Sequence, residues 1–480
     1  MTASAAGRAV LAAGERRLIG IGLALLAVAA ALWGLARLGP EAAPLGLTPA
    51  IWTMAILMAG GAVWLALPGA LRSVEAEGRS GLLLAVLGLG LAMRLVLLGS
   101  APILEIDFYR YLWDGAAVAA GLNPYGMPPA EVLAGAAPAP WLAFGEEAAA
   151  VAGRINYPHL ATIYPPVAQG AFLLAAWVEP FGLGALRLVL LGFELSGVGL
   201  LVLLLRAVGR APVWVAIYWW NPLIAKELGN SAHMEAVLLP FLVGAVLLAL
   251  RLRPVAAAGV LALAAGVKLW PALLLPMLLA GAGWRRAAAG AGLAAAIGAA
   301  VAAPVLLSGL DRTSGFVAYA AAWERNDALF GGVREAIAVA LEGAGLHLLD
   351  PGRLARAGLM GLVALTALWL ARGVARDGPG ALPAGVLAVT ALLFLVSPTG
   401  YPWYYAWLLP FLAVVPVRGL MLLTLTLPLY YLRFEMVGRG QEALFDDWIV
   451  WLEFGPVLGL LLWDALRGRR IRRMGAGVPA

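Results

Sequence analysis

The chain contains no cysteine, and it contains few charged residues. Without cysteine there can be no disulfide, no thiolate nucleophile and no metal site with cysteine ligands. Charged residues account for 12% of the 480 residues, about half of the roughly 25% that is typical of soluble domains. The sequence also lacks a P-loop, a dinucleotide-binding glycine motif, zinc-ligand spacing and a nucleophile elbow in a suitable context. These absences argue against a soluble protein and against nucleotide-driven chemistry.

Apolar residues dominate instead: 63% of the chain is hydrophobic, and the mean hydropathy is +0.90. Each bilayer crossing needs about 20 mostly apolar residues, and such runs recur from end to end. We therefore expect an all-α polytopic membrane protein, one integral-membrane unit over residues 1–480 with about 13 to 15 transmembrane helices. The first run lacks a convincing cleavage site and is expected to be a retained helix. The candidate crossings are residues 18–37, 48–70, 81–100, 164–184, 187–206, 211–227, 233–251, 254–281, 287–307, 355–373, 381–397, 402–416, 418–434 and 447–466.

Arginine residues lie between the apolar runs, in the spacing that the positive-inside rule produces. A membrane is therefore the expected partner of this basic charge, and nucleic acid is not. An N-terminus in the cytoplasm would place residues 102–166 outside. The basic tail Arg467–Arg473 would place residues 311–335, 398–402 and 435–446 on the same side. We expect a multi-pass protein of the inner (plasma) membrane, with its active site facing the periplasm or the exterior.

The order of these segments predicts three parts: N-terminal transmembrane helices in residues 1–80, a core in 81–310 with an external loop at 101–166, and a C-terminal transmembrane part in 311–480. One region conflicts with this topology. Two full crossings between residues 164 and 206 would place Arg206 and Arg210 outside. Either one of those crossings is re-entrant, or the charge rule fails there.

The longest polar interval, residues 102–166, contains the first candidate site, Glu105 and Asp107. Two residues apart in a loop or strand, both side chains point the same way. Such a pair can hold a divalent cation, or one member can act as a general base. The alternative is a pair of solvated carboxylates at a helix end. The adjoining Arg110 and several aromatic residues favour a site, because a simple linker would not need them.

A second group lies in WNPLIAKELGNSAHMEA, which places Lys226, His233 and Glu235 in or beside apolar helices. Ionisable groups at membrane depth are unfavourable unless they are paired or face water. A polar N-terminal cap on the following helix is the alternative interpretation. Lys226 and Lys268 are the two lysines of the chain. Each could bind a lipid phosphate or could snorkel to the membrane interface.

Two further groups lie in the C-terminal part. In FVAYAAAWERNDALFGG, Arg325 could bind a phosphate in a bidentate manner, or it could pair with Asp327 in a surface turn. In SPTGYPWYYAW, Tyr401 and Trp403 belong to an aromatic cluster broken by prolines. This cluster could be an interfacial aromatic belt, or it could be a wall for a prenyl chain or a sugar ring.

Taken in order, these motifs resemble the GT-C superfamily of integral-membrane glycosyltransferases. The closest resemblance is to the bacterial polyprenyl-phosphate-dependent branch, related to the mannosyltransferases of glycosyltransferase family 87 and to GPI mannosyltransferase I. The motifs that carry it are EIDFYRYLWDG, GLNPY, INYPHLATIYPPVAQ, WNPLIAKELGNSAHMEA, GVKLWP, WERNDALF and SPTGYPWYYAWLLPF.

The resemblance implies a GT-C fold whose large first external loop carries short amphipathic helices. It implies an inverting transfer of a hexose, mannose by analogy, from a polyprenyl-phosphate donor to a lipid or glycan acceptor. Asp107 matches the position of the base, and Glu105 stands where many relatives have aspartate. It implies no required cofactor, and it leaves open whether a divalent cation binds at Glu105 and Asp107. The expected donor-phosphate and substrate-binding residues are Arg110, Arg154, Tyr157, His159, Tyr164, Lys226, His233, Glu235, Lys268, Arg325, Asp327, Tyr401 and Trp403.

Two other functions fit parts of the pattern. A secondary transporter or lipid flippase would use charges such as Lys226 and Lys268 along a translocation path. The sequence shows no internal repeat, and its polar groups are concentrated in one external loop, which argues against transport. A surface-polysaccharide ligase or polymerase would use the same architecture with a diphosphate-linked donor.

Overall fold

The computed structural model describes residues 12–38, 47–77 and 81–475, with side chains up to residue 467. These residues form helices and no strand. An isolated parallel bridge joins Arg325 to Thr399. The expected all-α polytopic membrane fold is thus confirmed.

Among the described residues, eight helical segments are long and apolar enough to cross a membrane, or nine if a pair bent by 120° forms one span. The bent pair joins Pro222–Asn230 (α11, Pro222–Ile224, and the π-helical η4, Ala225–Asn230) to α12 (Glu235–Leu250). The eight are α1 (Ala13–Arg37), α2 with α3 (Pro49–Trp64, Leu67–Ala76), α9 (Leu183–Ala207), α15 (Trp284–Leu307), α18 (Pro351–Asp377), η6 with α19 (Pro379–Ala381, Leu382–Val396), α21 with η8 and α22 (Arg418–Thr426, Leu427–Tyr431, Leu432–Gly438), and α23 with η9 and α24 (Glu442–Leu444, Phe445–Ile449, Val450–Gly475).

The other apolar runs of the described residues form shorter or broken helices. For this reason the number of long apolar helices, eight or nine, is lower than the 13 to 15 crossings expected from the sequence. Proline at the start of many segments fixes φ and removes a backbone donor, so it begins a new helix instead of continuing an old one. The shorter segments are α4 (Leu83–Leu98), α8 (Pro166–Val178), α10 with η3 (Ala216–Trp219, Pro212–Val215), α13 (Pro254–Ala265), η5 with α14 (Trp270–Leu274, Leu275–Leu279) and η7 with α20 (Pro402–Trp407, Leu409–Val414).

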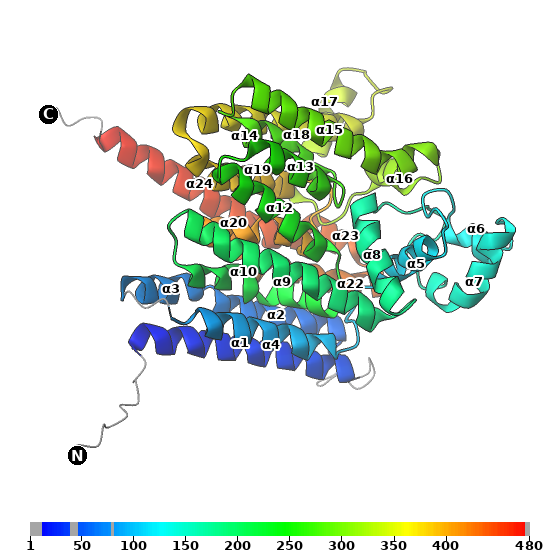
Figure 1. Cartoon of the computed structure of the whole chain (residues 1–480), viewed down its shortest axis with the longest axis horizontal. Helices are drawn as coiled ribbons and strands as arrows, with labels where there is room; N and C mark the ends of the chain where they lie inside the picture. The colour runs from blue at the N-terminus through cyan, green and yellow to red at the C-terminus, as the bar shows by residue number, and fades with distance from the viewer. Residues whose placement is uncertain (1–11, 39–46, 78–80, 476–480) are drawn as a thin grey trace, which may run out of the picture.

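The remaining helices are α5 (Phe108–Ala119), α6 (Pro129–Leu133), α7 (Ala139–Ala152), α16 (Gly315–Ala322) and α17 (Ala328–Gly343). Figure 1 shows α5, α6 and α7 at one end of the helical bundle, which we call the loop end. Helices α6 and α7 pack on α5 through a small hydrophobic core of their own that includes Trp113, Trp141 and Phe144. The opposite end, which carries Arg206 and Arg210, we call the basic end.

Helix α8 resolves the topological conflict between residues 164 and 206. Its 13 residues extend about 20 Å, less than the roughly 30 Å of a bilayer core. Arg187, near the start of the following α9, donates to the carbonyl groups of Leu98 (2.8 Å) and Ser100 (2.7 Å) at the loop end. At the other end of α9, the side chain of Glu75 in α3 accepts from the indole of Trp214. Helix α8 therefore stays at the loop end while α9 crosses, so Arg206 and Arg210 reach the basic end.

The interior is organised by tryptophans that are seated against glycines. A Cβ atom at Gly90 of α4 would lie 2.1 Å from the ring of Trp219, so only glycine fits there. The indole N–H groups of Trp219 and Trp220 donate to the carbonyl groups of Leu87 (3.0 Å) and Val86 (2.8 Å). These contacts fix α10 against α4, and they hold the segment that follows, which carries the buried charges.

Candidate functional site

Strained backbone marks the segments from which the candidate site is built. Six non-glycine residues in the described part of the chain have positive φ, a conformation that is uncommon for residues with a Cβ atom. Four of them are Leu104 (φ 70°), Tyr157 (53°), Ala232 (57°) and Asn326 (56°), and each is or adjoins a residue that the sequence singled out. Such conformations persist where the surrounding structure enforces them, often at functional sites.

Backbone hydrogen bonds bring these distant segments together. The amide N–H of Arg325 donates to Pro398 (2.8 Å), and that of Gly400 donates to Arg325 (2.9 Å). A Cβ atom at Gly400 would lie 2.3 Å from the carbonyl oxygen of Asn326, so this close approach requires glycine. On another side, the side chain of Asn230 accepts from the amide of Ile103 (2.8 Å). The loops near residues 325 and 400 are thus tied together, and so are those near residues 103 and 230.

Asp107 and Glu105 lie in this site in different surroundings. Asp107 is partly exposed, and its Oδ1 accepts from Nδ2 of Asn156 (3.1 Å). Glu105 is only 7% exposed, and its Oε1 has no hydrogen-bond partner among the described residues. Burial, together with the nearby carboxylates of Glu227 and Asp107, raises the pKa of Glu105 to about 8 against the opposing charge of Lys226. This shift favours the protonated form of Glu105, which can donate a hydrogen bond.

A fully buried charge cluster lies next to Glu105. The carboxylate of Glu227 contacts Nζ of Lys226 (3.1 Å) and Nε2 of His233 (3.0 Å), and it accepts from the hydroxyl group of Tyr431. These side chains are inaccessible to solvent. Charges buried in this way require partners, and Glu227 lies against the ammonium group of Lys226 and the imidazole of His233 at once. We call these four residues the Glu227 cluster.

A second pair lies beside the Glu227 cluster. Nζ of Lys268 is 2.6 Å from Oε1 of Glu235 and lies over the ring of Tyr404, 3.6 Å from its centroid. The Lys268 side chain is 16% exposed, whereas that of Glu235 is 1% exposed. A cation over an aromatic face is stabilised by the ring quadrupole. Lys268 thus has both an anionic and an aromatic partner.

An aromatic stack joins the buried charges to the loops. The imidazole of His233 lies on the indole of Trp403 with centroids 3.9 Å apart, and Trp403 lies on Tyr401 at 4.5 Å. Tyr401 is the outermost of the three and is partly accessible. The sequence allowed two interpretations of this aromatic cluster, an interfacial belt or a wall of the site. In the structure the cluster contacts His233, a predicted site residue, directly.

Arg325 and Asp327 flank Asn326, the residue in the left-handed conformation. Nδ2 of Asn326 donates to the carbonyl oxygen of Gly400 (2.8 Å) and to the buried carboxyl group of Glu453 on α24 (2.7 Å). Arg325 and Asp327 form no ion pair with each other in the described part of the chain. Burial and the neighbouring Glu324 raise the pKa of Asp327 to about 7, against the charge of Arg334.

The remaining predicted residues surround or support this site. Arg110 donates to the carbonyl oxygens of Tyr157 (3.2 Å) and Leu160 (2.9 Å), so it holds the loop in place. Arg154 donates to the hydroxyl group of Tyr109 (2.7 Å) at the surface.

Two aromatic residues complete this set. The ring of Tyr164 packs edge-on against Tyr111 and Phe172, so its ring is part of the support. His159 is exposed and contacts the edge of Tyr157. Within the described residues, no third His, Asp or Glu joins Glu105 and Asp107 to form a group that could hold a metal ion.

Several residues of the site were not among the predicted binding residues. Tyr430 and Tyr431 follow Pro428 in an apolar run, Asn326 lies between the predicted Arg325 and Asp327, and Glu453 lies in a candidate crossing. The ring of Tyr430 contacts those of Tyr401 (6.1 Å) and Trp403 (6.3 Å). A proline-interrupted Tyr-Tyr pair and a lone glutamate in a crossing were the signals that could have indicated them.

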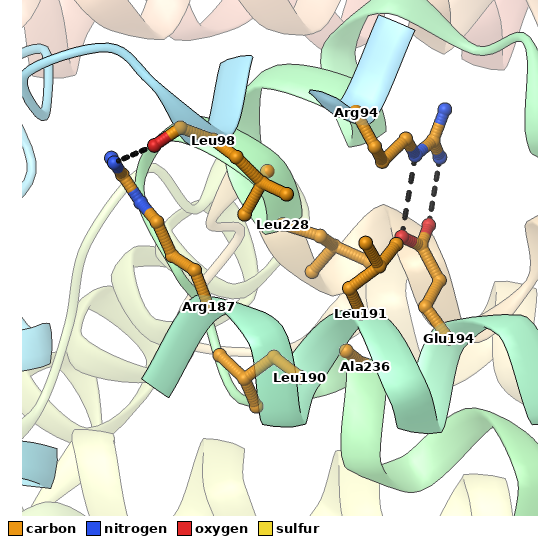
Figure 2. A pocket seen from close by; sticks show the side chains of 9 residues that line it. Arg94, Leu98, Arg187, Leu190, Leu191, Glu194, Leu228 and Ala236 are labelled. Carbon is orange, nitrogen blue, oxygen red and sulfur yellow. Dashed lines mark hydrogen bonds and ion pairs between the residues drawn. The ribbon is translucent and has the colours of Figure 1, made fainter. Parts of the chain in front are cut away.

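A separate small cavity of about 10 Å³ lies between α4, α9 and η4 (Figure 2). Figure 2 shows Arg94 and Glu194 joined across it and Arg187 directed at the backbone of Leu98. Its remaining lining is mostly leucine. This volume holds at most about one water molecule, far below the roughly 300 to 1,000 Å³ of typical ligand pockets, and the cavity contains none of the predicted site residues.

A comparison with known protein families found a match. The model of glycosyltransferase family 87 matches residues 162–398, just under half of the chain, and this segment includes Lys226, His233 and Arg325. No curated protein and no solved structure matches. The family match, together with the membrane-spanning helices, supports a membrane glycosyltransferase.

Proposed function

We propose that the protein transfers a hexose from a polyprenyl-phosphate donor to a hydroxyl group of a lipid or glycan acceptor, with inversion at the anomeric carbon. Mannose is the sugar we expect, by analogy with the resembling family. The observation that carries the proposal is the position of Asp107. It is a partly exposed carboxylate without an ion-pair partner among the described residues, beside the buried Glu105 and the charges of the Glu227 cluster.

In the proposed reaction Asp107 accepts the proton of the acceptor hydroxyl group. The acceptor oxygen forms a bond to the anomeric carbon, while the bond from that carbon to the phosphate oxygen breaks. The electron pair of that bond leaves with the polyprenyl phosphate. General-base catalysis of this kind contributes about 10²- to 10⁴-fold to a rate. Asn156, which donates to Oδ1 of Asp107 at 3.1 Å, would hold the carboxylate in orientation.

The leaving phosphate requires stabilisation of its negative charge. The neutral carboxyl group of Glu105 can donate a hydrogen bond to it, which an ionised glutamate could not do. Arg325 is half-buried and interacts with the side chain of Tyr157, but it is not ion-paired to a carboxylate in the described part of the chain, so its charge is not neutralised. Lys226, His233 and Lys268 already contact carboxylates, so they would act mainly through the field of the site.

The membrane provides the route for a lipid-linked donor. Helix α15, next to the loop end, has little buried surface, and exposed leucines such as Leu306 and Leu307 lie at its end. An apolar tail can lie along such a surface while its phosphate reaches the polar loops. We propose that this end faces the periplasm or exterior of an inner (plasma) membrane.

A transfer assay tests the function. Purified protein in detergent receives a polyprenyl-phosphate hexose labelled in the sugar, together with membrane lipid extract as the source of acceptor. We expect release of polyprenyl phosphate and a labelled product whose anomeric configuration is opposite to that of the donor. Consumption of a diphosphate-linked donor alone would support the ligase or polymerase alternative. Flux of lipid across vesicles without any covalent product would support a transporter. Added EDTA tests whether a divalent cation takes part.

A further inference from the structure

We propose that Arg433, on α22, is a second donor-phosphate ligand, and that it forms with Arg325 a two-arginine clamp for the phosphate group of a polyprenyl phosphate. The inference rests on the proposed function and assigns a further residue to its donor site. Arg433 lies outside residues 162–398, the segment that matches the glycosyltransferase family.

The first step is the state of the Arg433 charge. The residue lies in the apolar segment Arg418–Gly438, and its side chain is 14% exposed. Its Nε has no hydrogen-bond partner in the described part of the chain. Its ion pair, with the half-exposed Glu442, is long at 3.8 Å. A guanidinium group in a membrane segment with such loose compensation is unfavourable, which marks it as a functional candidate.

The second step is its position. Arg433 follows Tyr430 and Tyr431 on the same turn of chain, and Tyr431 donates to Glu227 at the centre of the Glu227 cluster. The ring of Tyr430 packs edge-on against Tyr401, next to which Arg325 is held by the backbone bridge to residues 398–400. The segments of Arg325 and Arg433 are thus joined through Tyr401 and Tyr430.

The third step is the electrostatic field between the two arginines. Both guanidinium groups act electrostatically on the hydroxyl group of Tyr430, and so do the carboxyl groups of Glu105 and Asp107. Tyr430 is therefore within electrostatic reach of both arginines and of the predicted catalytic carboxyl groups. A phosphate bound by the arginines would occupy the surroundings of the proposed base, as the leaving group must.

Arginine is suited to this role because its planar group binds phosphate oxygens with paired hydrogen bonds. The other cations of the site, Lys226, His233 and Lys268, are within 3.1 Å of carboxylates. Arg325 and Arg433 lack a close carboxylate: Arg325 interacts with the side chain of Tyr157, and the ion pair of Arg433 with Glu442 is 3.8 Å long. The exposed Asp446 also lies in the field of both arginines without an ion pair to either in the described part of the chain. A purely structural role would make the arginines counter-ions of Asp446.

The test compares Arg433→Gln with Arg439→Gln, an exposed arginine on the same segment that is paired with Glu435. We expect Arg433→Gln to raise the KM for the polyprenyl-phosphate hexose by about 10- to 100-fold, as loss of a charge-assisted hydrogen bond predicts. The KM for the acceptor should change less than threefold, and Arg439→Gln should change neither. Unchanged donor KM in Arg433→Gln overturns the proposal. The proposal is also overturned if Asp446→Asn raises the donor KM as much as Arg433→Gln does, because the arginines would then be structural counter-ions of Asp446.

A binding experiment separates this proposal from the proposed function. The thermal stability of the wild type and of Arg433→Gln is measured with polyprenyl phosphate, with the uncharged polyprenol, with phosphatidylglycerol and with inorganic phosphate. Stabilisation of the wild type by polyprenyl phosphate alone, lost in Arg433→Gln, supports the clamp even if no sugar is transferred. Equal stabilisation by phosphatidylglycerol or inorganic phosphate indicates a general anion site and overturns donor specificity. Equal stabilisation of both variants by polyprenyl phosphate overturns the role of Arg433.

Discussion

Two buried charged regions of the molecule differ in how completely they are paired. Arg94 and Glu194 form two hydrogen bonds, 3.2 and 2.7 Å long, and Arg94 also donates to the carbonyl oxygen of Trp219 (2.5 Å). Tyr218 donates to the same carboxylate at 3.2 Å. No positive φ occurs at any of these residues. Every charge there is neutralised within the helices, so the region has no capacity left for a ligand.

The loop-end site is built differently. Glu105 is buried without a partner for Oε1, Asp107 is partly exposed, and strained residues such as Leu104 and Asn326 adjoin the charged groups. Incomplete pairing and backbone strain persist where binding or catalysis needs them. Burial of charge alone therefore does not identify a site in this protein. Buried polar groups with unused hydrogen-bonding capacity identify it.

The largest effect should follow from Asp107→Asn, which keeps the shape of the side chain and the contact with Asn156 but removes the base. We expect the transfer rate to fall by about 10²- to 10⁴-fold with little change in thermal stability. The measurement is the initial rate of sugar transfer at saturating donor. Glu131→Gln, at an exposed glutamate on α6, is the control and should keep full activity. Full activity in Asp107→Asn would place the base elsewhere.

The opposite result should follow in the fully paired region. Glu194→Gln leaves the buried charge of Arg94 without its counter-ion, and breaking a buried pair in this way costs about 3 to 5 kcal/mol. We expect a large drop in the unfolding temperature in detergent, while the folded fraction transfers sugar at the wild-type rate. Replacing both residues by methionine should recover most of the stability. A specific loss of kcat in Glu194→Gln would contradict the structural role.

The pH dependence of stability and of the transfer rate should reveal Glu105, the incompletely paired group of the loop-end site. Between the usual pKa of 4.5 and about 8, the folded protein keeps a proton on Glu105 that the unfolded chain has released. The contribution of this group to stability therefore falls as pH rises through that interval and levels off above pH 8. We expect the transfer rate to fall above pH 8 as well, because an ionised Glu105 repels the leaving phosphate. Glu105→Gln, which stays neutral and can donate, should remove this alkaline limb; an unchanged profile would exclude Glu105 as its cause.

The sequence was sufficient for the class of fold, because a chain this apolar can satisfy its backbone in lipid only as helices or a barrel. It also singled out segments that the structure brings together, since charged residues such as Glu105, Lys226 and Arg325 stand out against an apolar background. It overestimated the number of long helices, because hydropathy does not register where proline divides a run into short or broken helices. Helix α8 illustrates this: it reads as a crossing, but it is too short for one.

The pairing within the site could not be read from the sequence. Glu227 was visible in its motif, yet its contact with Tyr431 joins residues 204 positions apart. The pair of Arg325 and Asp327, one of the two alternatives that the sequence left open, is not formed in the described part of the chain, where the left-handed Asn326 between them is bound to Gly400 and Glu453. Such contacts depend on tertiary packing, which the local pattern does not encode.

The smallest effect should come from the lock that holds Arg325. Asn326→Ala removes the hydrogen bonds to Gly400 and Glu453 and places a Cβ residue without local support at a φ of 56°. Asn326→Gly removes the same hydrogen bonds but accepts this φ without strain. We expect the donor KM to rise about three- to tenfold in both variants, since about 1 kcal/mol of positioning is lost. Thermal stability should fall further in Asn326→Ala. If the two variants differed in donor KM as much as in stability, backbone strain at residue 326, and not the side-chain hydrogen bonds, would position Arg325. The difference between the fully paired region and the loop-end site would then lie in the backbone conformation.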